Sequence, residues 1–248
     1  MNITHKQLVV ENLLSSYTDA GTGRALILLH GWGCHSGTFK DLQSALSEKY
    51  RVIAVDFPGF GRSEEPEEIW GCREYAQWTQ RFLQKLNIPS PLMLGHSFGG
   101  RVALVLNSLL PVSGLVLTGS AGLKAANHAP KKSPARYLPA CLKKGLLRDI
   151  FIQLAGSDDY KRASPRMREV LKKVIAEDLR PFAEKITVPT LLIWGENDQE
   201  TPVAAGEDFH ATIPSSTLEI MTDCGHYAFL ENKNVFLDLI TKFWETND

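Results

Sequence analysis

The chain has 248 residues, which is long enough to bury one large core, as either one α/β domain or two small ones. Hydrophobic residues make up 44% of the chain and charged residues 22%, a composition that is ordinary for a globular protein and argues against a disordered one. The formal net charge of -1 gives no reason to expect a nucleic acid partner.

The N-terminal half predicts a β-hairpin followed by strands that alternate with helices. Loose alternation over residues 7 to 20 is typical of a hairpin, and Gly21 to Gly23 form a turn after it. The elements expected next, in chain order, are a strand at 26–29, a helix near 39–47, a strand at 52–55, a helix near 74–86 and a strand at 92–94. Strands that feed helices and return parallel indicate a doubly wound sheet, whose sites lie at the carboxyl ends of the strands.

A Gly-x-Ser-x-Gly motif, Gly95 to Gly99, follows the strand at 92–94 and leads straight into an apolar helix at 101–106. The two glycines remove Cβ atoms where strand and helix must nearly touch, so Ser97 is expected at the end of the strand in a strained conformation. A serine hydroxyl is a poor nucleophile at neutral pH. It therefore needs a histidine base and an acid that orients the imidazole.

Both partners can be found after later strands. After a strand at 115–117, an apolar run at 190–194 predicts a buried strand, and the loop that follows it carries Asp198. Another strand is predicted at 217–221, and His226 comes after it. The candidate nucleophile, acid and base thus each follow a predicted strand.

Two other carboxylates compete with Asp198 for the role of the acid. Asp223 is only three residues from His226, too near in sequence to reach the imidazole Nδ1 as easily as a residue on the loop of a neighbouring strand. Asp56 follows a strand end, where it is expected to organise its own Pro-Gly turn. The sequence favours Asp198.

The order Ser97, Asp198, His226 resembles that of the α/β-hydrolase superfamily, and the resemblance covers nearly the whole chain. The segment His30-Gly31-Trp32-Gly33 is similar to the oxyanion loop of that family, and the segment from Asp56 to Ser63 is similar to its Asp-x-Pro-Gly-x-Gly-x-Ser sequence. The resemblance implies an α/β-hydrolase fold with a doubly wound, mostly parallel sheet.

The resemblance also implies roles for particular residues. Ser97 would be the nucleophile, His226 the base and Asp198 the acid, while the backbone N–H groups of Trp32 and Phe98 would form the oxyanion hole. No metal and no cofactor are implied.

An insertion interrupts the alternation of strands and helices. The expected organisation is a hydrolase core over residues 1–120 and 183–248 with a helical lid at 121–182. Within the lid, the stretch from Lys124 to Arg148 is basic and contains no acidic residue. This charge is consistent with a solvated helix face, with attraction of anionic substrates or of an acidic carrier protein, and with weak association to a membrane surface.

A carboxylesterase or thioesterase for a small to medium acyl group is the leading hypothesis, with a small-molecule ester or thioester as substrate. A serine nucleophile argues against the dehalogenases and epoxide hydrolases of the family, and the loop from His30 to Cys34 is similar to that of carboxylesterases, including those acting on carrier-bound methyl esters. Hydrolysis of carbon–carbon bonds, lactone opening and perhydrolysis use the same triad. A small-molecule receptor that keeps the triad but does not turn over is the alternative from another class.

The sequence shows no metal-binding cysteine pattern, signal peptide or membrane span. The four cysteines Cys34, Cys72, Cys141 and Cys224 lie far apart and lack the spacing of a zinc site. The N-terminus has no apolar core of signal-peptide length, and the apolar region at 102–117 is interrupted by polar residues and a proline. We therefore expect a cytoplasmic protein with no membrane span. Its oligomeric state cannot be predicted from these features.

Overall fold

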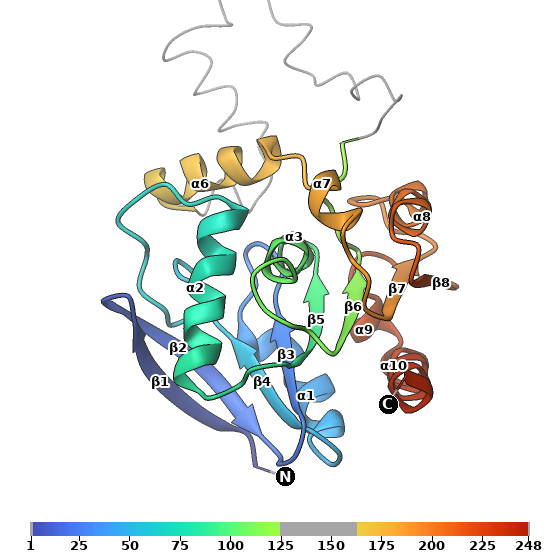
Figure 1. Ribbon diagram of the computed structural model, residues 1–248, viewed down its shortest axis with the longest axis horizontal. Helices are drawn as coiled ribbons and strands as arrows, with labels where there is room; N and C mark the ends of the chain where they lie inside the picture. Colours follow the sequence, from blue (N-terminus) through green and yellow to red (C-terminus); the bar gives the residue numbers. More distant parts are fainter. Residues whose placement is uncertain (1, 125–162, 248) are drawn as a thin grey trace, which may run out of the picture.

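The computed structural model describes residues 2–124 and 163–247. In this part of the chain the strands are β1 (Thr4–Val10), β2 (Leu13–Ala20), β3 (Ala25–Leu29), β4 (Arg51–Val55), β5 (Leu92–His96), β6 (Gly114–Thr118), β7 (Thr190–Gly195) and β8 (Ser216–Met221). They form one sheet in the order β1-β2-β4-β3-β5-β6-β7-β8 (Figure 1). The hairpin β1–β2 and the pair β2–β4 are antiparallel, and all later pairs are parallel.

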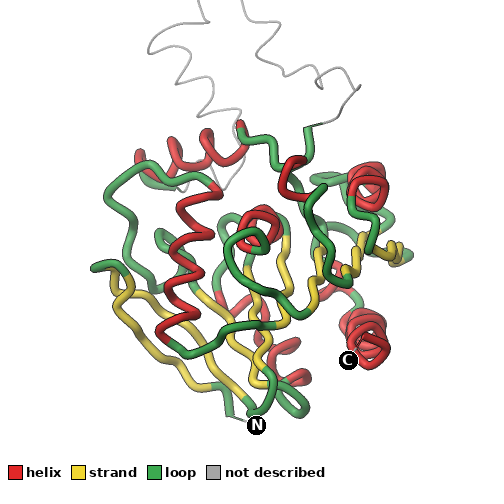
Figure 2. Tube along the Cα trace, in the orientation of Figure 1, coloured by secondary structure: helices red, strands yellow, loops and turns green. Residues whose placement is uncertain are grey.

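Helices cover both faces of this sheet (Figure 2). They are the 3-10 helix η1 (Ser36–Phe39), α1 (Lys40–Leu46), α2 (Cys72–Lys85), α3 (Phe98–Leu106), α6 (Pro165–Ala176), α7 (Arg180–Ala183), α8 (Val203–Thr212), α9 (Ala228–Glu231) and α10 (Lys233–Asn247). The side chains of α2, α3, α6 and α8 join one hydrophobic cluster, and those of α1, α9 and α10 join another. The predicted doubly wound, mostly parallel sheet is confirmed.

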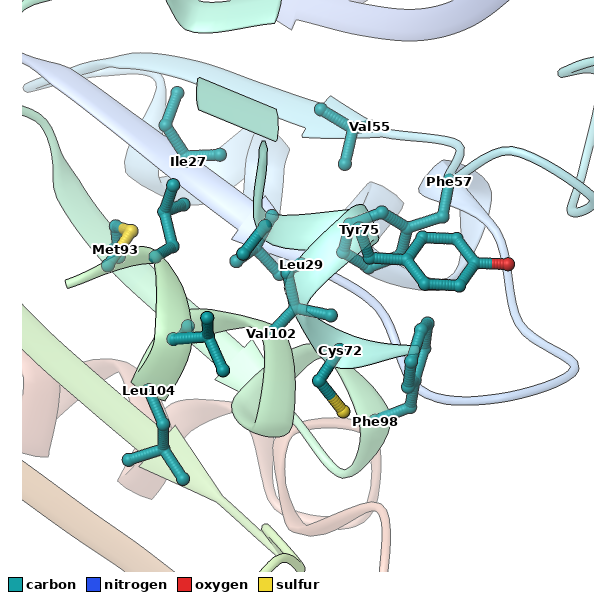
Figure 3. Close-up of a cluster of buried hydrophobic side chains, with 14 of the residues drawn as sticks. Ile27, Leu29, Val55, Phe57, Cys72, Tyr75, Met93, Phe98, Val102 and Leu104 are labelled. Atoms are coloured by element: carbon teal, nitrogen blue, oxygen red, sulfur yellow. The ribbon is translucent and has the colours of Figure 1, made fainter. Parts of the chain in front are cut away.

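The two clusters arise from the period of two in a strand. In β3, Ile27 and Leu29 enter the cluster beneath α2 and α3, whereas Leu26 and Leu28 enter the cluster beneath α1 and α10. Figure 3 shows the first cluster, with Ile27 and Leu29 facing helix side chains such as Val102. A strand buried on both faces reads as a continuous apolar run, which is why the central strands could be predicted from the sequence.

Helix α6 lies across the end of α2 (Figure 1). Its apolar side chains Met167, Val170 and Val174 recur at helical spacing and are buried. Beyond its end, the Glu177 carboxylate accepts a hydrogen bond of 2.9 Å from the backbone N–H of Cys72, the first residue of α2. This acceptor satisfies an N–H group that has no partner within its own helix.

The predicted elements outside the insertion match the structure closely. The helix expected near 39–47 is divided into the 3-10 turn η1 and the shorter α1. The expected lid lies largely outside the described residues, including Cys141 and all of the basic stretch except Lys124. Among the described helices, none has the length and apolarity needed to cross a membrane. The cytoplasmic location stays a prediction.

Candidate active site

Ser97 occupies the turn between β5 and α3 in a conformation that L-residues rarely adopt. Its φ is 51° and its ψ is -110°. A Cβ atom at Gly95 would lie 2.8 Å from the Cα of Gly100, and one at Gly99 would collide with the carbonyl oxygen of Leu29 on β3. The glycines of the motif therefore allow the helix to approach both strands, and the half-buried Ser97 lies at the carboxyl edge of the sheet.

Asp198 and His226 meet at the same edge, from the loops that follow the paired strands β7 and β8. The distance between His226 Nδ1 and Asp198 Oδ2 is 2.8 Å, and both side chains are buried. Because an ionised carboxylate can only accept a hydrogen bond, His226 carries its proton on Nδ1, and its Nε2 points away from Asp198. The His226 ring lies against His96, with ring centroids 4.7 Å apart, beside the serine turn.

The Asp198 carboxylate is held by its own loop. Oδ1 accepts the backbone N–H groups of Glu200 at 2.9 Å and Thr201 at 2.8 Å, and Oδ2 accepts the Thr201 hydroxyl at 2.8 Å. Burial raises the pKa of Asp198, but the hydrogen bonds from His226 and Thr201 outweigh it, so that the pKa lies below its ordinary value. The carboxylate beside His226 is therefore ionised at neutral pH.

The hydrogen bonds of the two competing residues, Asp56 and Asp223, lead to groups other than His226. Asp56 accepts the backbone N–H groups of Ser36 at 2.6 Å and Arg62 at 3.0 Å, which organises the turn after β4 as the sequence predicts. Asp223 has a positive φ of 57°, and its backbone N–H donates to Glu196 at 3.3 Å. The hydrogen bond to the imidazole thus involves the carboxylate that the sequence favours.

The two predicted oxyanion donors flank the serine. Trp32 follows β3 in a loop that passes close to the turn, because a Cβ at Gly31 would lie 3.4 Å from the Cβ of Ser97. Phe98 is the first residue of α3, where N–H groups have no acceptor within the helix. Within residues 2–124 and 163–247, neither the Trp32 N–H nor the Phe98 N–H donates a hydrogen bond to the protein. Both donors are thus available to an external oxygen.

A cavity of about 260 Å³ opens on the oxyanion-loop side of the site. Its wall contains Trp32 and Phe60, whose ring centroids are 4.8 Å apart, and Met167 of α6. Trp32 also contacts Phe98 edge-on, with a centroid distance of 5.4 Å. The remaining lining residues are Gly33, Cys34, His35, Gly59, Gly61, Glu65, Ala163 and Ser164. The wall combines aromatic and other apolar side chains with polar ones, as suits a small organic ligand.

The two other histidines near the site are built into the structure as neutral groups. Burial lowers the pKa of His30 to about 4 and that of His96 to about 3. His30 donates to the Gly31 carbonyl at 2.7 Å and accepts the Phe57 N–H at 3.1 Å, and His96 donates to the Thr118 carbonyl at 3.2 Å. These rings brace the loops around Ser97 and are not arranged to exchange protons with a substrate.

Sequence reasoning missed three residues of the site. Thr201 holds the acid, Glu200 lies 3.4 Å from His226 Nε2, and the hydroxyl of Tyr227 lies 3.7 Å from the sulfur of Cys34. A threonine three residues after an aspartate is a recognisable signal of side-chain capping. The other two contacts depend on tertiary geometry. Among the described residues, no group of three His, Cys, Asp or Glu side chains is placed to hold a metal ion.

The profile of the alpha/beta hydrolase family matches residues 26–239, which include all the residues just described. The chain belongs to the alpha/beta hydrolase family. The order of its strands and the turn at Ser97 agree with that assignment.

This hydrolase is similar to proteins that are named for two different chemistries. It is 28% identical to a pimeloyl-(acyl-carrier protein) methyl ester esterase of Nitrosomonas europaea, over 88% of this chain and 94% of that protein. It is also 28% identical to a 2-hydroxy-6-oxo-6-(2'-aminophenyl)hexa-2,4-dienoic acid hydrolase of Metapseudomonas resinovorans, over 92% of this chain and 86% of that protein. An esterase structure from Exiguobacterium antarcticum superposes with a TM-score of 0.78 at 25% identity, over 97% and 99% of the two chains. The family and these relatives support a serine hydrolase acting on esters.

The neutral state of the buried histidines predicts a pH dependence of stability. Because the folded pKa of His96 lies below the unfolded value, unfolding takes up a proton and the protein loses stability as the pH falls below about 6.5. We expect His96→Asn to reduce the loss of unfolding free energy between pH 7 and pH 5 by about 2 kcal/mol, measured by urea denaturation. The exposed His5→Asn is the matched control, and an equal change in that variant would contradict the burial argument.

Proposed function

We propose that this protein is a serine esterase that cleaves a carboxylic ester or thioester of a small to medium acyl group. The single observation that carries the proposal is the hydrogen bond of 2.8 Å between His226 and Asp198 at the edge of the sheet where Ser97 projects. A serine on a strained turn, at the same sheet edge as an imidazole fixed in one tautomer, is suited to acyl transfer. The esterase relatives support the same reaction class.

In the proposed reaction Ser97 Oγ attacks the acyl carbonyl and His226 Nε2 takes the proton of the hydroxyl. The carbonyl oxygen becomes negative and is stabilised by the backbone N–H groups of Trp32 and Phe98. The tetrahedral intermediate collapses, and His226 returns the proton to the departing alcohol or thiol. Water then attacks the acyl-enzyme with His226 as base, and Ser97 is released as the acid product leaves.

Asp198 acts on this sequence through His226. Its carboxylate accepts the Nδ1–H group, which keeps Nε2 unprotonated in the resting enzyme and stabilises the imidazolium that forms in each half-reaction. Thr201 is a positioning residue, because its hydroxyl and its N–H group hold the two oxygens of Asp198. Residues 121–182 are proposed as the lid, of which α6 supplies Met167 to the cavity wall.

Hydrolysis of a carbon–carbon bond is the second candidate, favoured by the similarity to the 2-hydroxy-6-oxo-6-(2'-aminophenyl)hexa-2,4-dienoic acid hydrolase. The similarity to the pimeloyl-(acyl-carrier protein) methyl ester esterase makes a carrier-bound ester one possible substrate of the first candidate. A profile of purified protein against acyl esters and thioesters of graded chain length and charge, with one vinylogous diketone ring-cleavage product, distinguishes these chemistries. If the protein hydrolysed the diketone and none of the esters or thioesters, carbon–carbon bond hydrolysis would replace the esterase proposal.

The covalent role of Ser97 is tested with a serine-directed fluorophosphonate. We expect a single adduct by intact-mass analysis, because Ser97 is the only serine with a positive φ among residues 2–124 and 163–247. Ser97→Ala should not be labelled and should lose about 10⁶ in kcat. Labelling that persists in Ser97→Ala would sink the assignment, and Ser120→Ala is the matched control that should still be labelled.

The assignment of Asp198 as the acid is tested by comparing two variants in which an asparagine replaces an aspartate. Asp198→Asn should retain the fold and lower kcat by roughly 10⁴, because the imidazole then loses its productive tautomer. Asp223→Asn should leave kcat within a factor of a few, since Asp223 does not hydrogen-bond the imidazole. The opposite ranking in steady-state kinetics on one ester would transfer the role to Asp223.

A further inference from the structure

Glu200 brings a second carboxylate to the imidazole, on the side opposite Asp198. Its Oε2 lies 3.4 Å from His226 Nε2, while Asp198 Oδ2 lies 2.8 Å from His226 Nδ1. The two carboxylates differ in their surroundings, because the Asp198 side chain is fully buried and 69% of the Glu200 side chain is exposed. Glu200 therefore borders both the base and solvent.

The backbone at Glu200 is fixed by the same loop that holds the acid. The N–H of Glu200 donates to Asp198 Oδ1 at 2.9 Å, and the next residue, Thr201, donates twice to the same carboxylate. Within residues 2–124 and 163–247, the ion pairs formed by Glu200 include no lysine or arginine. Its negative charge thus lies next to Nε2, with no lysine or arginine of the described residues within ion-pair distance.

The position relative to Nε2 decides which half of the substrate meets this charge. In acyl transfer Nε2 gives its proton to the oxygen of the leaving group, which must come within about 3 Å of that nitrogen. The acyl half lies on the other side of the reacting carbon, with its carbonyl oxygen directed to the N–H groups of Trp32 and Phe98. Glu200 therefore borders the alcohol half of an ester.

We infer that Glu200 determines specificity for the charge of the leaving group. Esters of cationic alcohols are favoured over neutral isosteres, and esters of anionic alcohols are disfavoured. This inference rests on the proposed esterase function and adds a substrate class to it. It concerns the alcohol half only, so it is compatible with an acidic or carrier-bound acyl half.

The size of the preference follows from the exposure of Glu200. Two unit charges near 4 Å in a largely aqueous setting interact enough to change a rate by about fivefold at low ionic strength. The Debye length shrinks from roughly 30 Å at 0.01 M salt to roughly 3 Å at 1 M salt, so the preference should decline as salt is added. A preference that grew with salt would have a hydrophobic origin instead.

The experiment compares butyrate esters that differ only in the charge of the alcohol. The pairs are choline butyrate with its neutral tert-butyl isostere, in which carbon replaces the quaternary nitrogen, and dimethylaminoethyl butyrate with isopentyl butyrate. Sulfoethyl butyrate supplies the anionic leaving group. We expect kcat/KM to be about fivefold higher for the cationic member of each pair and lower for the sulfonate, at pH 7 and low salt.

Variants then assign the preference to one carboxylate. Glu200→Gln should bring the cationic-to-neutral ratio close to one, and Glu200→Lys should invert it. Glu207→Gln is the matched control, because Glu207 is an exposed glutamate on the adjoining helix α8 and its loss changes the net charge equally. That variant should keep the wild-type ratio.

Two results with the variants would overturn the inference. The first is a ratio in Glu200→Gln equal to that of the wild type, and the second is an equal loss of the ratio in Glu207→Gln. Failure of the esterase proposal has a different signature, because the neutral esters would then not be hydrolysed and Ser97 would not be labelled. Hydrolysis of the neutral esters with no charge preference would leave the esterase proposal intact and remove only the role of Glu200.

Discussion

The close approach of α3 to β5 and β3 at Ser97 is the constraint on which the rest of the structure depends. It requires hydrogen in place of a side chain at Gly95 and Gly99, since a Cβ at either position would collide with backbone. It also forces Ser97 into a φ of 51°, which costs about 1–3 kcal/mol and persists only where the surrounding structure enforces it. Here the strands on both sides of β5 and the buried face of α3 supply that enforcement.

The base and the acid follow from the same architecture. The carboxyl ends of parallel strands meet at one edge, so the loops after β7 and β8 bring Asp198 and His226 together although the two residues are 28 positions apart in the sequence. The Asp198 loop then closes on its own carboxylate through Thr201. Because these groups are hydrogen-bonded before a substrate arrives, little reorganisation is needed during the proposed reaction.

Much of the fold could be predicted from the sequence because its signals are local. The central strands are continuous apolar runs, the serine turn is marked by its glycines, and the candidate acid and base each follow a strand. Asp198 could be preferred to Asp223 because an aspartate three residues from the histidine cannot easily reach Nδ1, and the hydrogen bond of 2.8 Å agrees with that preference. The break between η1 and α1 was not predicted, because apolar periodicity does not distinguish a 3-10 turn from the first turn of a helix.

Contacts between distant segments could not be predicted in this way. Nothing near Cys72 in the sequence indicates that Glu177 binds the start of α2 from 105 residues away. The position of Glu200 beside Nε2 likewise depends on how the β7 loop bends around Asp198. An exposed glutamate in a loop is usually only a solvated charge. The contact of Glu200 with His226, from the loop after the neighbouring strand, is what distinguishes it.

The central claim is that the Ser97 oxygen attacks an acyl carbon whose carbonyl oxygen accepts hydrogen bonds from two backbone N–H groups. The most direct measurement is a crystal structure of the protein after reaction with an alkyl fluorophosphonate. The account predicts phosphorus bonded to Ser97 Oγ, with the phosphoryl oxygen about 2.7–3.1 Å from both the Trp32 and the Phe98 nitrogen. Phosphorus on another residue, or a phosphoryl oxygen directed away from those two nitrogens, would contradict it.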